Sequence, residues 1–192
     1  MVSGRWWWMG WSSRAPMIWV PQNRPAMHIR PAQSHEAGIV ADILAAAAAH
    51  IRAKGEIIWD PPEISEAAIG GHVRAGMYHL AFDDEGPVGA FRFQLDDNFF
   101  WPDVPAGSSG FVHKLAVYPG KQGADIAQTL LAHACDLARQ HGRPYLRLDC
   151  MSGKPRLRAV YERFGFRLHS QKELDGLLFD RFELALGPPL VR

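Results

Sequence analysis

The 192-residue sequence has few cysteines, almost no net charge and no apolar run long enough to span a membrane. Its two cysteines, Cys135 and Cys150, lie in apolar segments, which excludes a disulfide scaffold and suits a reducing compartment. We therefore expect a cytoplasmic protein. Its 21 Lys and Arg residues stand against 20 Asp and Glu residues, a net charge of +1. This balance provides no basic surface, so neither nucleic acid nor a membrane is expected as a partner of the domain.

Spacings typical of metal ligands are missing as well. The 9 histidines are scattered and form no HExxH pattern, and the sequence contains no CxxC, so no metal is expected. Internal repeats and coiled-coil heptads are not found. What is present, a hydrophobic fraction of 47% and a charged fraction of 21%, is typical of a globular protein with a core. The length predicts one domain with some additional chain.

That additional chain is expected at residues 1–26, which contain five of the 7 tryptophans among Arg, Ser and Pro. No uninterrupted apolar segment of signal-peptide length occurs there. One interpretation is a poorly ordered extension that precedes a single domain over residues 27–192. The other is a Trp-rich segment that binds a membrane interface or a partner.

Hydrophobic periodicity predicts alternating strands and helices after residue 26. A period of 3.6 predicts a helix capped by Ser34 and ended by Gly55, and Asp60 before two prolines predicts the start of the next. Short apolar runs between turn residues predict strands. The expected strands are 27–30, 77–82, 88–95, 111–117, 145–150, 166–170 and 177–186, with later helices after 119–123 and from Pro155 to Arg163. This order predicts an α/β (α+β) fold with helices on the faces of a mixed sheet.

The stretch from Phe111 to Leu131 combines a strand, a glycine-containing turn and a helix start. The first amides of a helix have no partner within it, so such a turn can hold an anion such as a phosphate. Many α/β proteins share this feature, and its neighbours decide what it means.

Three motifs, in this order, resemble those of the GNAT superfamily of acetyl-CoA-dependent N-acetyltransferases, over roughly residues 27–186. The resemblance implies a mostly antiparallel, twisted sheet of about seven strands with helices on both faces. The motifs are Leu115-Ala116-Val117-Tyr118-Pro119, like the family's fourth strand, Gln122-Gly123-Ala124-Asp125-Ile126-Ala127, like its pyrophosphate loop, and Val160-Tyr161-Glu162-Arg163-Phe164-Gly165-Phe166, like its late helix-to-strand signature.

The resemblance implies an enzyme that transfers an acetyl group from acetyl-CoA to a primary amine of a small molecule or peptide by direct attack. It implies that Leu115, Ala116 and Val117 bind the pantetheine arm and that residues 122–127 bind the diphosphate. Tyr161 would lie near the thioester sulfur, where its protonated hydroxyl could donate to the leaving thiolate. Tyr161 could instead simply pack its helix against the sheet. Lys154 replaces a frequent asparagine and could meet a phosphate.

Asp125 departs from the family pattern because it replaces the middle glycine of the pyrophosphate loop. Two like charges ~4 Å apart cost about 1 kcal/mol in water and about 4 kcal/mol at a surface-like dielectric. A second hypothesis is therefore a non-catalytic CoA-binding or regulatory module on the same fold. Calorimetry with acetyl-CoA separates the two: rescue of binding only in Asp125→Gly would indicate a degenerate site.

The acceptor amine must lose a proton before attack, and a lysine-like amine has a pKa near ~10.4, so a base is needed. The expected topology suggests His113 and Asp149, although His113 could be a core histidine and Asp149 a turn cap. Trp59, Trp101 and Asp103 are expected to rim the acceptor pocket, where aromatic walls beside an acid suit an amine. The two tryptophans could instead anchor loops. The identity of the amine stays open, as does a homodimer formed through an exposed late strand.

Overall fold

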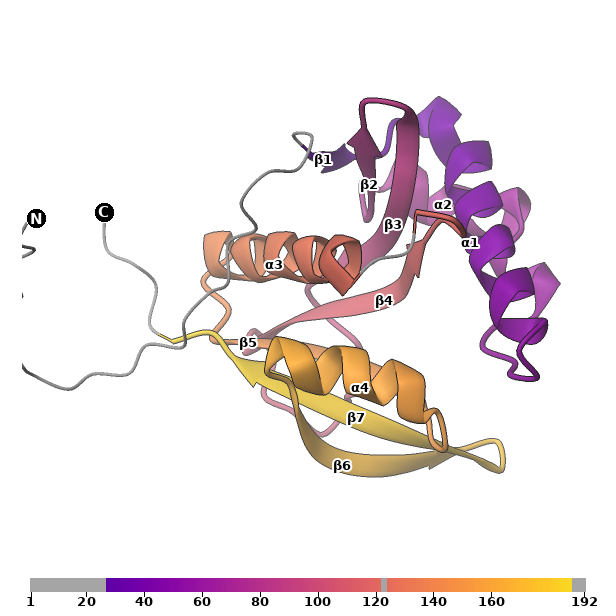
Figure 1. Ribbon diagram of the computed structural model, residues 1–192. Coiled ribbons are helices and arrows are strands. Elements are labelled where there is room, and N and C mark those ends of the chain that lie inside the picture. Colours follow the sequence, from indigo (N-terminus) through magenta and orange to yellow (C-terminus); the bar gives the residue numbers. More distant parts are fainter. Residues whose placement is uncertain (1–26, 122–123, 188–192) are drawn as a thin grey trace, which may run out of the picture.

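The structure is a computed structural model that describes residues 27–121 and 124–187. Expectations for residues 1–26, Gln122 and Gly123 lie outside these residues. One sheet of seven strands has the order β1-β2-β3-β4-β5-β7-β6, and only the β4–β5 pair is parallel (Figure 1). The strands are β1 His28–Pro31, β2 Tyr78–Asp83, β3 Gly86–Gln94, β4 Ser109–Val117, β5 Tyr145–Met151, β6 Arg167–Leu174 and β7 Leu177–Ala185. The predicted mostly antiparallel, seven-stranded sheet is confirmed.

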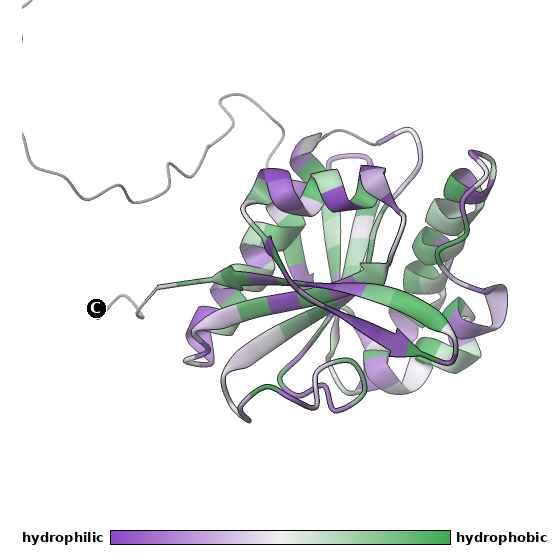
Figure 2. Ribbon diagram, turned by 90° about the horizontal axis from the view of Figure 1, so that it is seen from below, coloured by the Kyte–Doolittle hydropathy of each residue, from purple (hydrophilic) through white to green (hydrophobic). Residues whose placement is uncertain are grey.

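Helices cover both faces of the sheet, as predicted. Figure 1 shows α1 and α2 together on one side and α3 with α4 on the other. Each pair has its own buried apolar cluster against the strands, and Figure 2 shows the hydrophobic and hydrophilic banding of the helices. No helix in the described part of the chain is long and apolar enough to cross a membrane. The α-helices are α1 Ala37–Arg52, α2 Glu66–Arg74, α3 Ala124–Gln140 and α4 Pro155–Phe164.

Two helix starts differ from the prediction. Ser34 begins a short 3-10 turn, η1 (Ser34–Glu36), rather than capping α1. Asp60 and its prolines form a second 3-10 turn, η2 (Pro61–Ile64), in which the Asp60 amide donates to Glu63 Oε2 at 3.2 Å. The extended backbone of Ser65 then separates η2 from α2. The Ser65 hydroxyl caps α2 by accepting from Ala68 N at 3.3 Å.

Close packing of the sheet against α3 depends on a glycine in β4. An ideal Cβ on Gly110 would lie 2.6 Å from the Phe93 ring and 3.1 Å from Ala138 of α3. These separations are too short for a side chain, so only glycine lets the helix and the aromatic ring approach the strand this closely.

The sheet divides between β4 and β5. Their paired residues run only from Ser109 opposite Tyr145 to Val112 opposite Leu148. Just beyond, β4 bulges: two residues, Lys114 and Leu115, face a single residue of β3, and Lys114 has a φ of 51°. A bulge bends its strand and changes the direction of its side chains. The second half of β4 therefore leaves β5 and opens the sheet.

Candidate active site

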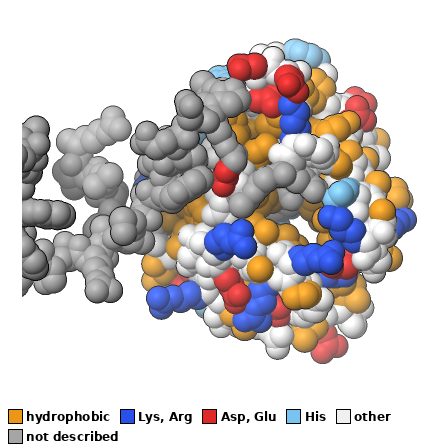
Figure 3. Space-filling view, viewed as in Figure 1, with side chains coloured by type: hydrophobic (Ala, Val, Ile, Leu, Met, Phe, Trp, Pro, Cys, Tyr) orange, Lys and Arg blue, Asp and Glu red, His pale blue; other side chains and the backbone are white. Residues whose placement is uncertain are grey.

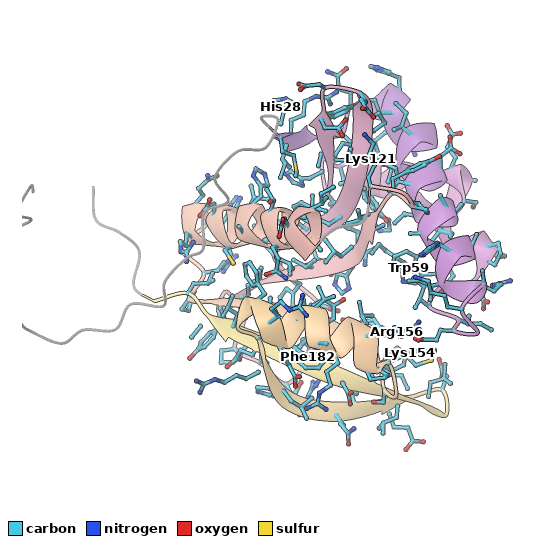
Figure 4. The ribbon with its side chains drawn as sticks, viewed as in Figure 1. His28, Trp59, Lys121, Lys154, Arg156 and Phe182 are labelled. Carbon is cyan, nitrogen blue, oxygen red and sulfur yellow. The ribbon has the colours of Figure 1, made fainter. Side chains whose placement is uncertain are left out.

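A cleft of about 640 Å³ occupies the space where β4 and β5 part. Its walls come from the end of α1, the 57–63 segment, β3, β4, β5, α4 and the β6–β7 turn. Trp59 lines one side and Lys154 the other, and Figure 4 shows Trp59 opposite Lys154 and Arg156. The cleft therefore joins segments that are far apart in the sequence.

At its base lies a histidine between two carboxylates. His113 Nε2 is 3.2 Å from Asp97 Oδ2, and His113 Nδ1 is 3.6 Å from Asp149 Oδ1. These contacts lack the alignment of hydrogen bonds. All three side chains are at most 8% exposed. His113 and Asp149 meet because each is the first residue after the last β4–β5 pair.

Asp97 was not predicted from the sequence. It lies in the loop between β3 and β4, where its Oδ1 accepts from the amides of Phe99 at 3.1 Å and Phe100 at 3.0 Å. These bonds orient the carboxylate so that its Oδ2 faces His113. One feature of the sequence could have indicated Asp97: it is an acid in the turn after β3, the strand that pairs with the strand of His113.

The two carboxylates have pKa values shifted in opposite directions. Burial raises the pKa of Asp149 to about 6, and the charge of Asp97 adds to the rise while His113 opposes it. Burial also acts to raise the pKa of Asp97, but the contact and charge of His113, with two loop amides, outweigh it and leave that pKa lowered. Asp149 can therefore exchange a proton near neutral pH, while Asp97 stays ionised.

Tyr161 of α4 lines the same cleft and is 5% exposed. Its ring packs near Phe166 and Phe182, with centroids 6.1 Å and 5.7 Å away. Burial, followed by the nearby Cys150 and Asp149, raises the pKa of Tyr161 well above its usual value. The hydroxyl is thus a proton donor at neutral pH. The three predicted catalytic residues are brought to one cleft, and Tyr161 also packs its helix.

The predicted cofactor residues divide into three groups. Those that line the cleft are Leu115, Ala116, Val117, Ala127, Lys154 and Tyr161. Ala124 begins α3, Asp125 lies in its first turn, and Ile126 is buried in the core behind it. Gln122 and Gly123 lie outside the described residues. Lys121, just before them, is held by Asp83 at 2.8 Å and by Glu85.

Of the predicted substrate residues, only Trp59 lines the cleft. Trp101 is 2% exposed, and its ring lies against the guanidinium groups of Arg147 and Arg181, at 5.4 Å and 4.8 Å. Asp103 binds Arg181, with contacts of 2.5 Å and 2.8 Å. The expected place of Trp101 and Asp103 on the rim is therefore corrected: buried arginines of β5 and β7 hold them against the sheet. The same loop lines the cleft with Phe99 and Phe100 instead.

Asp97, His113 and Asp149 could each offer one ligand atom to a metal ion, with those atoms within 4.8 Å of one another. The carboxylates, however, approach different nitrogens of the imidazole. A metal ion bound to one nitrogen would therefore have one carboxylate beside it and the other on the far side of the imidazole ring. The arrangement suits proton transfer better than metal binding.

Comparisons with known proteins identify the family and the fold of the chain. Mycothiol acetyltransferase from Beutenbergia cavernae is 35% identical over 66 residues, which cover 34% of this chain and 22% of that protein. The chain thus matches about a fifth of that relative's length. An acetyltransferase structure from Listeria monocytogenes has a TM-score of 0.68 at 19% identity, covering 83% of this chain and 94% of the other.

A second structure is yncA from Salmonella typhimurium, solved with its cofactor acetyl-CoA. It has a TM-score of 0.64 at 17% identity, and the match covers 87% of this chain and 98% of that one. At these identities the likeness concerns the fold. Residues 44–166, more than half of the sequence, match the model of the acetyltransferase (GNAT) family. The chain therefore belongs to the GNAT family of acetyltransferases.

Proposed function

We propose that the protein is an N-acetyltransferase that moves an acetyl group from acetyl-CoA to a primary amine by direct attack. The observation that carries this proposal is the convergence of Asp149, His113 and Tyr161 on one cleft between the parted strands. One group can accept a proton near neutral pH and another can donate one, as an amine acyl transfer requires.

The cleft suits acetyl-CoA, which would supply the activated acetyl group. The amide of Tyr118 donates to Val88 of β3 at 2.8 Å, and alternate amides of a strand point to opposite sides, so the Val117 amide faces the gap left by β5. An extended pantetheine arm can bind such an edge as an added strand. Lys154 lines the cleft and Arg156 follows it, and Figure 3 shows Lys and Arg side chains gathered over α4, where phosphates would meet positive charge.

Asp149 is suited to take the proton of the acceptor ammonium. With a pKa of about 6 it is mostly ionised at pH 7 to 8, yet it is a stronger base than an ordinary aspartate. His113 Nδ1 lies 3.6 Å from Asp149 Oδ1, and its charge opposes the rise in the pKa of Asp149. Asp97 fixes the imidazole from the other side.

Tyr161 is suited to protonate the leaving sulfur. The amine nitrogen forms its bond to the acetyl carbon, the carbon–sulfur bond breaks, and the thiolate takes the phenolic proton. The phenolate of Tyr161 then takes the second proton that the nitrogen loses as the amide forms. Cys150 also lines the cleft, but burial raises its pKa to about 12, so its thiol is a poor nucleophile. This supports direct attack rather than an acyl-enzyme.

The substitution Tyr161→Phe tests the acid. It keeps the ring that packs near Phe166 and Phe182 and removes only the hydroxyl. We expect kcat for amine-dependent thiol release to fall about 100-fold, with KM for the amine nearly unchanged. Unchanged turnover would remove Tyr161 from this role.

Calorimetry with acetyl-CoA provides the control for this experiment. Wild type and Tyr161→Phe should bind acetyl-CoA with similar affinity. Binding without thiol release for any amine would favour the non-catalytic module. Asp125 lies in the first turn of α3, so a gain in affinity in Asp125→Gly would show that its charge opposes the diphosphate.

A further inference from the structure

Arg92 of β3 lines the cleft. It faces His113 across the β3–β4 ladder and Tyr78 across the β2–β3 ladder, so its side chain shares their face of the sheet. Within the described residues, no ion pair or side-chain hydrogen bond of Arg92 is found, and its Nε is buried without a partner. Buried charged donors normally have acceptors. The charge of Arg92 acts on Asp149 without direct contact, so the guanidinium still lacks a hydrogen-bond acceptor that an anionic ligand could provide.

Lys114 adds a second cation to this wall. The bulge in β4 directs it into the cleft, where its side chain is 18% exposed and lies 5.1 Å from the Trp59 ring. Burial lowers the pKa of Lys114, and the charge of Arg92 lowers it further, while Glu63 opposes both from 3.4 Å. The φ of 51° at Lys114 is a strained conformation for lysine, and such conformations cluster at active sites and ligand-binding sites.

Three large apolar side chains are exposed at the mouth of the cleft, beside exposed carboxylates such as Asp60 and Asp175. Ile57, Phe99 and Leu177 are 53%, 60% and 48% exposed, although all three line the cleft. They come from three separate segments: the loop after α1, the loop after β3, and the β6–β7 turn. Large apolar side chains that gather at a pocket mouth usually cover an apolar part of a ligand.

This inference rests on the proposed transferase function, and it requires that one acceptor molecule meet three conditions. Its amine must reach Asp149, an anionic group must reach Arg92 and Lys114, and an apolar group must reach the mouth. A simple alkylamine would leave Arg92 without an acceptor and bring its own ammonium group near two cations. A peptide N-terminus has no carboxylate next to its amine.

We propose that the acceptor is a free apolar α-amino acid, with its carboxylate bound by Arg92 and Lys114 and its side chain covered by Ile57, Phe99 and Leu177. The carboxylate and the amine are then separated by one carbon atom. The two cations offset the charge that a carboxylate would otherwise bring beside Asp149.

The test uses the full chain with acetyl-CoA and three acceptors: L-phenylalanine, phenethylamine, which lacks the carboxylate, and L-alanine, which lacks the large side chain. We expect kcat/KM for phenylalanine to exceed both others by about 10-fold or more. Arg92→Gln should raise KM for phenylalanine about 10- to 100-fold and leave KM for phenethylamine unchanged or lower. The exposed Arg74 provides the matched control, since Arg74→Gln should change neither value.

A second variant guards against a folding defect in Arg92→Gln. Phe99 is well exposed, so Phe99→Ala should fold normally and raise KM for phenylalanine several-fold, but not KM for alanine. Phenethylamine as good as phenylalanine, or an equal loss for both in Arg92→Gln, would overturn the proposal and leave the transferase function intact.

Binding measurements cover the case in which none of the three acceptors is acetylated. Phenylalanine should bind the CoA-loaded protein at least 10-fold more tightly than phenethylamine, and Arg92→Gln should abolish the difference. Such binding without transfer would overturn the transferase function and keep the carboxylate subsite. If phenylalanine does not bind, the amino acid proposal is wrong.

Discussion

At the scale of single residues, the ionised carboxylate of Asp149, the form that can accept a proton, makes the folded protein less stable. Its pKa is about 6 in the fold against 3.8 for an ordinary aspartate. The folded protein therefore binds this proton more tightly than the unfolded chain does. The contribution of Asp149 to the free energy of unfolding is greatest below about pH 4. It falls as pH rises to about 6, by about 3 kcal/mol in all.

We therefore expect Asp149→Asn to raise the free energy of unfolding at pH 8 by about 1–3 kcal/mol while it lowers kcat about 100-fold or more. At pH 4 the two proteins should be equally stable, since Asp149 is then protonated. Urea unfolding at both pH values measures the difference. A less stable variant at pH 8 would mean that the ionised carboxylate is held by favourable contacts.

Residues in motifs could be predicted from the sequence, and those defined only by tertiary contacts could not. Tyr161 follows a recognisable helix-to-strand motif, and His113 and Asp149 follow from the expected strand order. Asp97 joins them only because its loop folds back across β4. Trp101 looks like a pocket residue in a Pro- and Gly-rich loop, and only the positions of two buried arginines make it an anchor.

At the scale of elements, the loop between β3 and β4 is held in place by Trp101, whose ring lies against Arg147 and Arg181. Trp101→Leu should cost about 3 kcal/mol of unfolding free energy, because it removes a large buried ring and uncovers two cations. Its KM for the amine should stay near the wild-type value. Urea unfolding and steady-state kinetics measure both.

Trp59 is the comparison, since it lines the cleft. Trp59→Leu should raise KM for the amine with a smaller loss of stability. If Trp101→Leu instead raised KM without destabilising the fold, Trp101 would return to the acceptor site.

The junction between β1 and α1 depends on Glu36. Its carboxylate accepts from Arg30 Nη1 and Nη2, each at 2.7 Å, and from the amide of Gln33 at 2.7 Å. The Arg30 bonds lower the pKa of Glu36 to about 2, so its stabilisation is present above about pH 4.5 and is lost as pH falls toward 2.

Glu36→Gln should therefore cost about 2 kcal/mol at pH 7, after allowance for the partly exposed Arg30, and almost nothing near pH 2. Equilibrium unfolding as a function of pH gives both values. Asp84→Asn, an exposed carboxylate in the β2–β3 turn, should have no effect at either pH. If the loss of unfolding free energy in Glu36→Gln did not depend on pH, the stabilisation would come from the packing of the side chain and not from its charge.

Elements with strong periodicity were predicted within a few residues, whereas the ends of elements without it were not. The helix expected from Asp60 breaks at Ser65, because a capping box can close a 3-10 turn as well as an α-helix. The strand β6 runs to Leu174 instead of Ser170. It is a mostly polar edge strand, and its pairing with β7, rather than any hydrophobic pattern, defines its length.

At the scale of the whole molecule, the seven strands and four α-helices found in the described residues lie between His28 and Ala185. Deletion of residues 1–26 should therefore change Tm by no more than about 1–2 °C and leave amine turnover intact. Thermal unfolding, thiol release and binding to lipid vesicles of the two chains provide the comparison. A lower Tm would mean that the tryptophans contribute to the core, and weaker vesicle binding would support the membrane-interface interpretation.

The separation of β4 from β5 has a consequence for hydrogen exchange. The Val117 amide faces the gap, so its proton is open to exchange with solvent, whereas the amide of Tyr118 is protected by Val88. A ligand arm added along β4 would protect the first amide and leave the second nearly unchanged. These two neighbouring amides then provide a probe and its internal reference, so occupancy of the cleft could be followed by exchange rates alone, without any turnover.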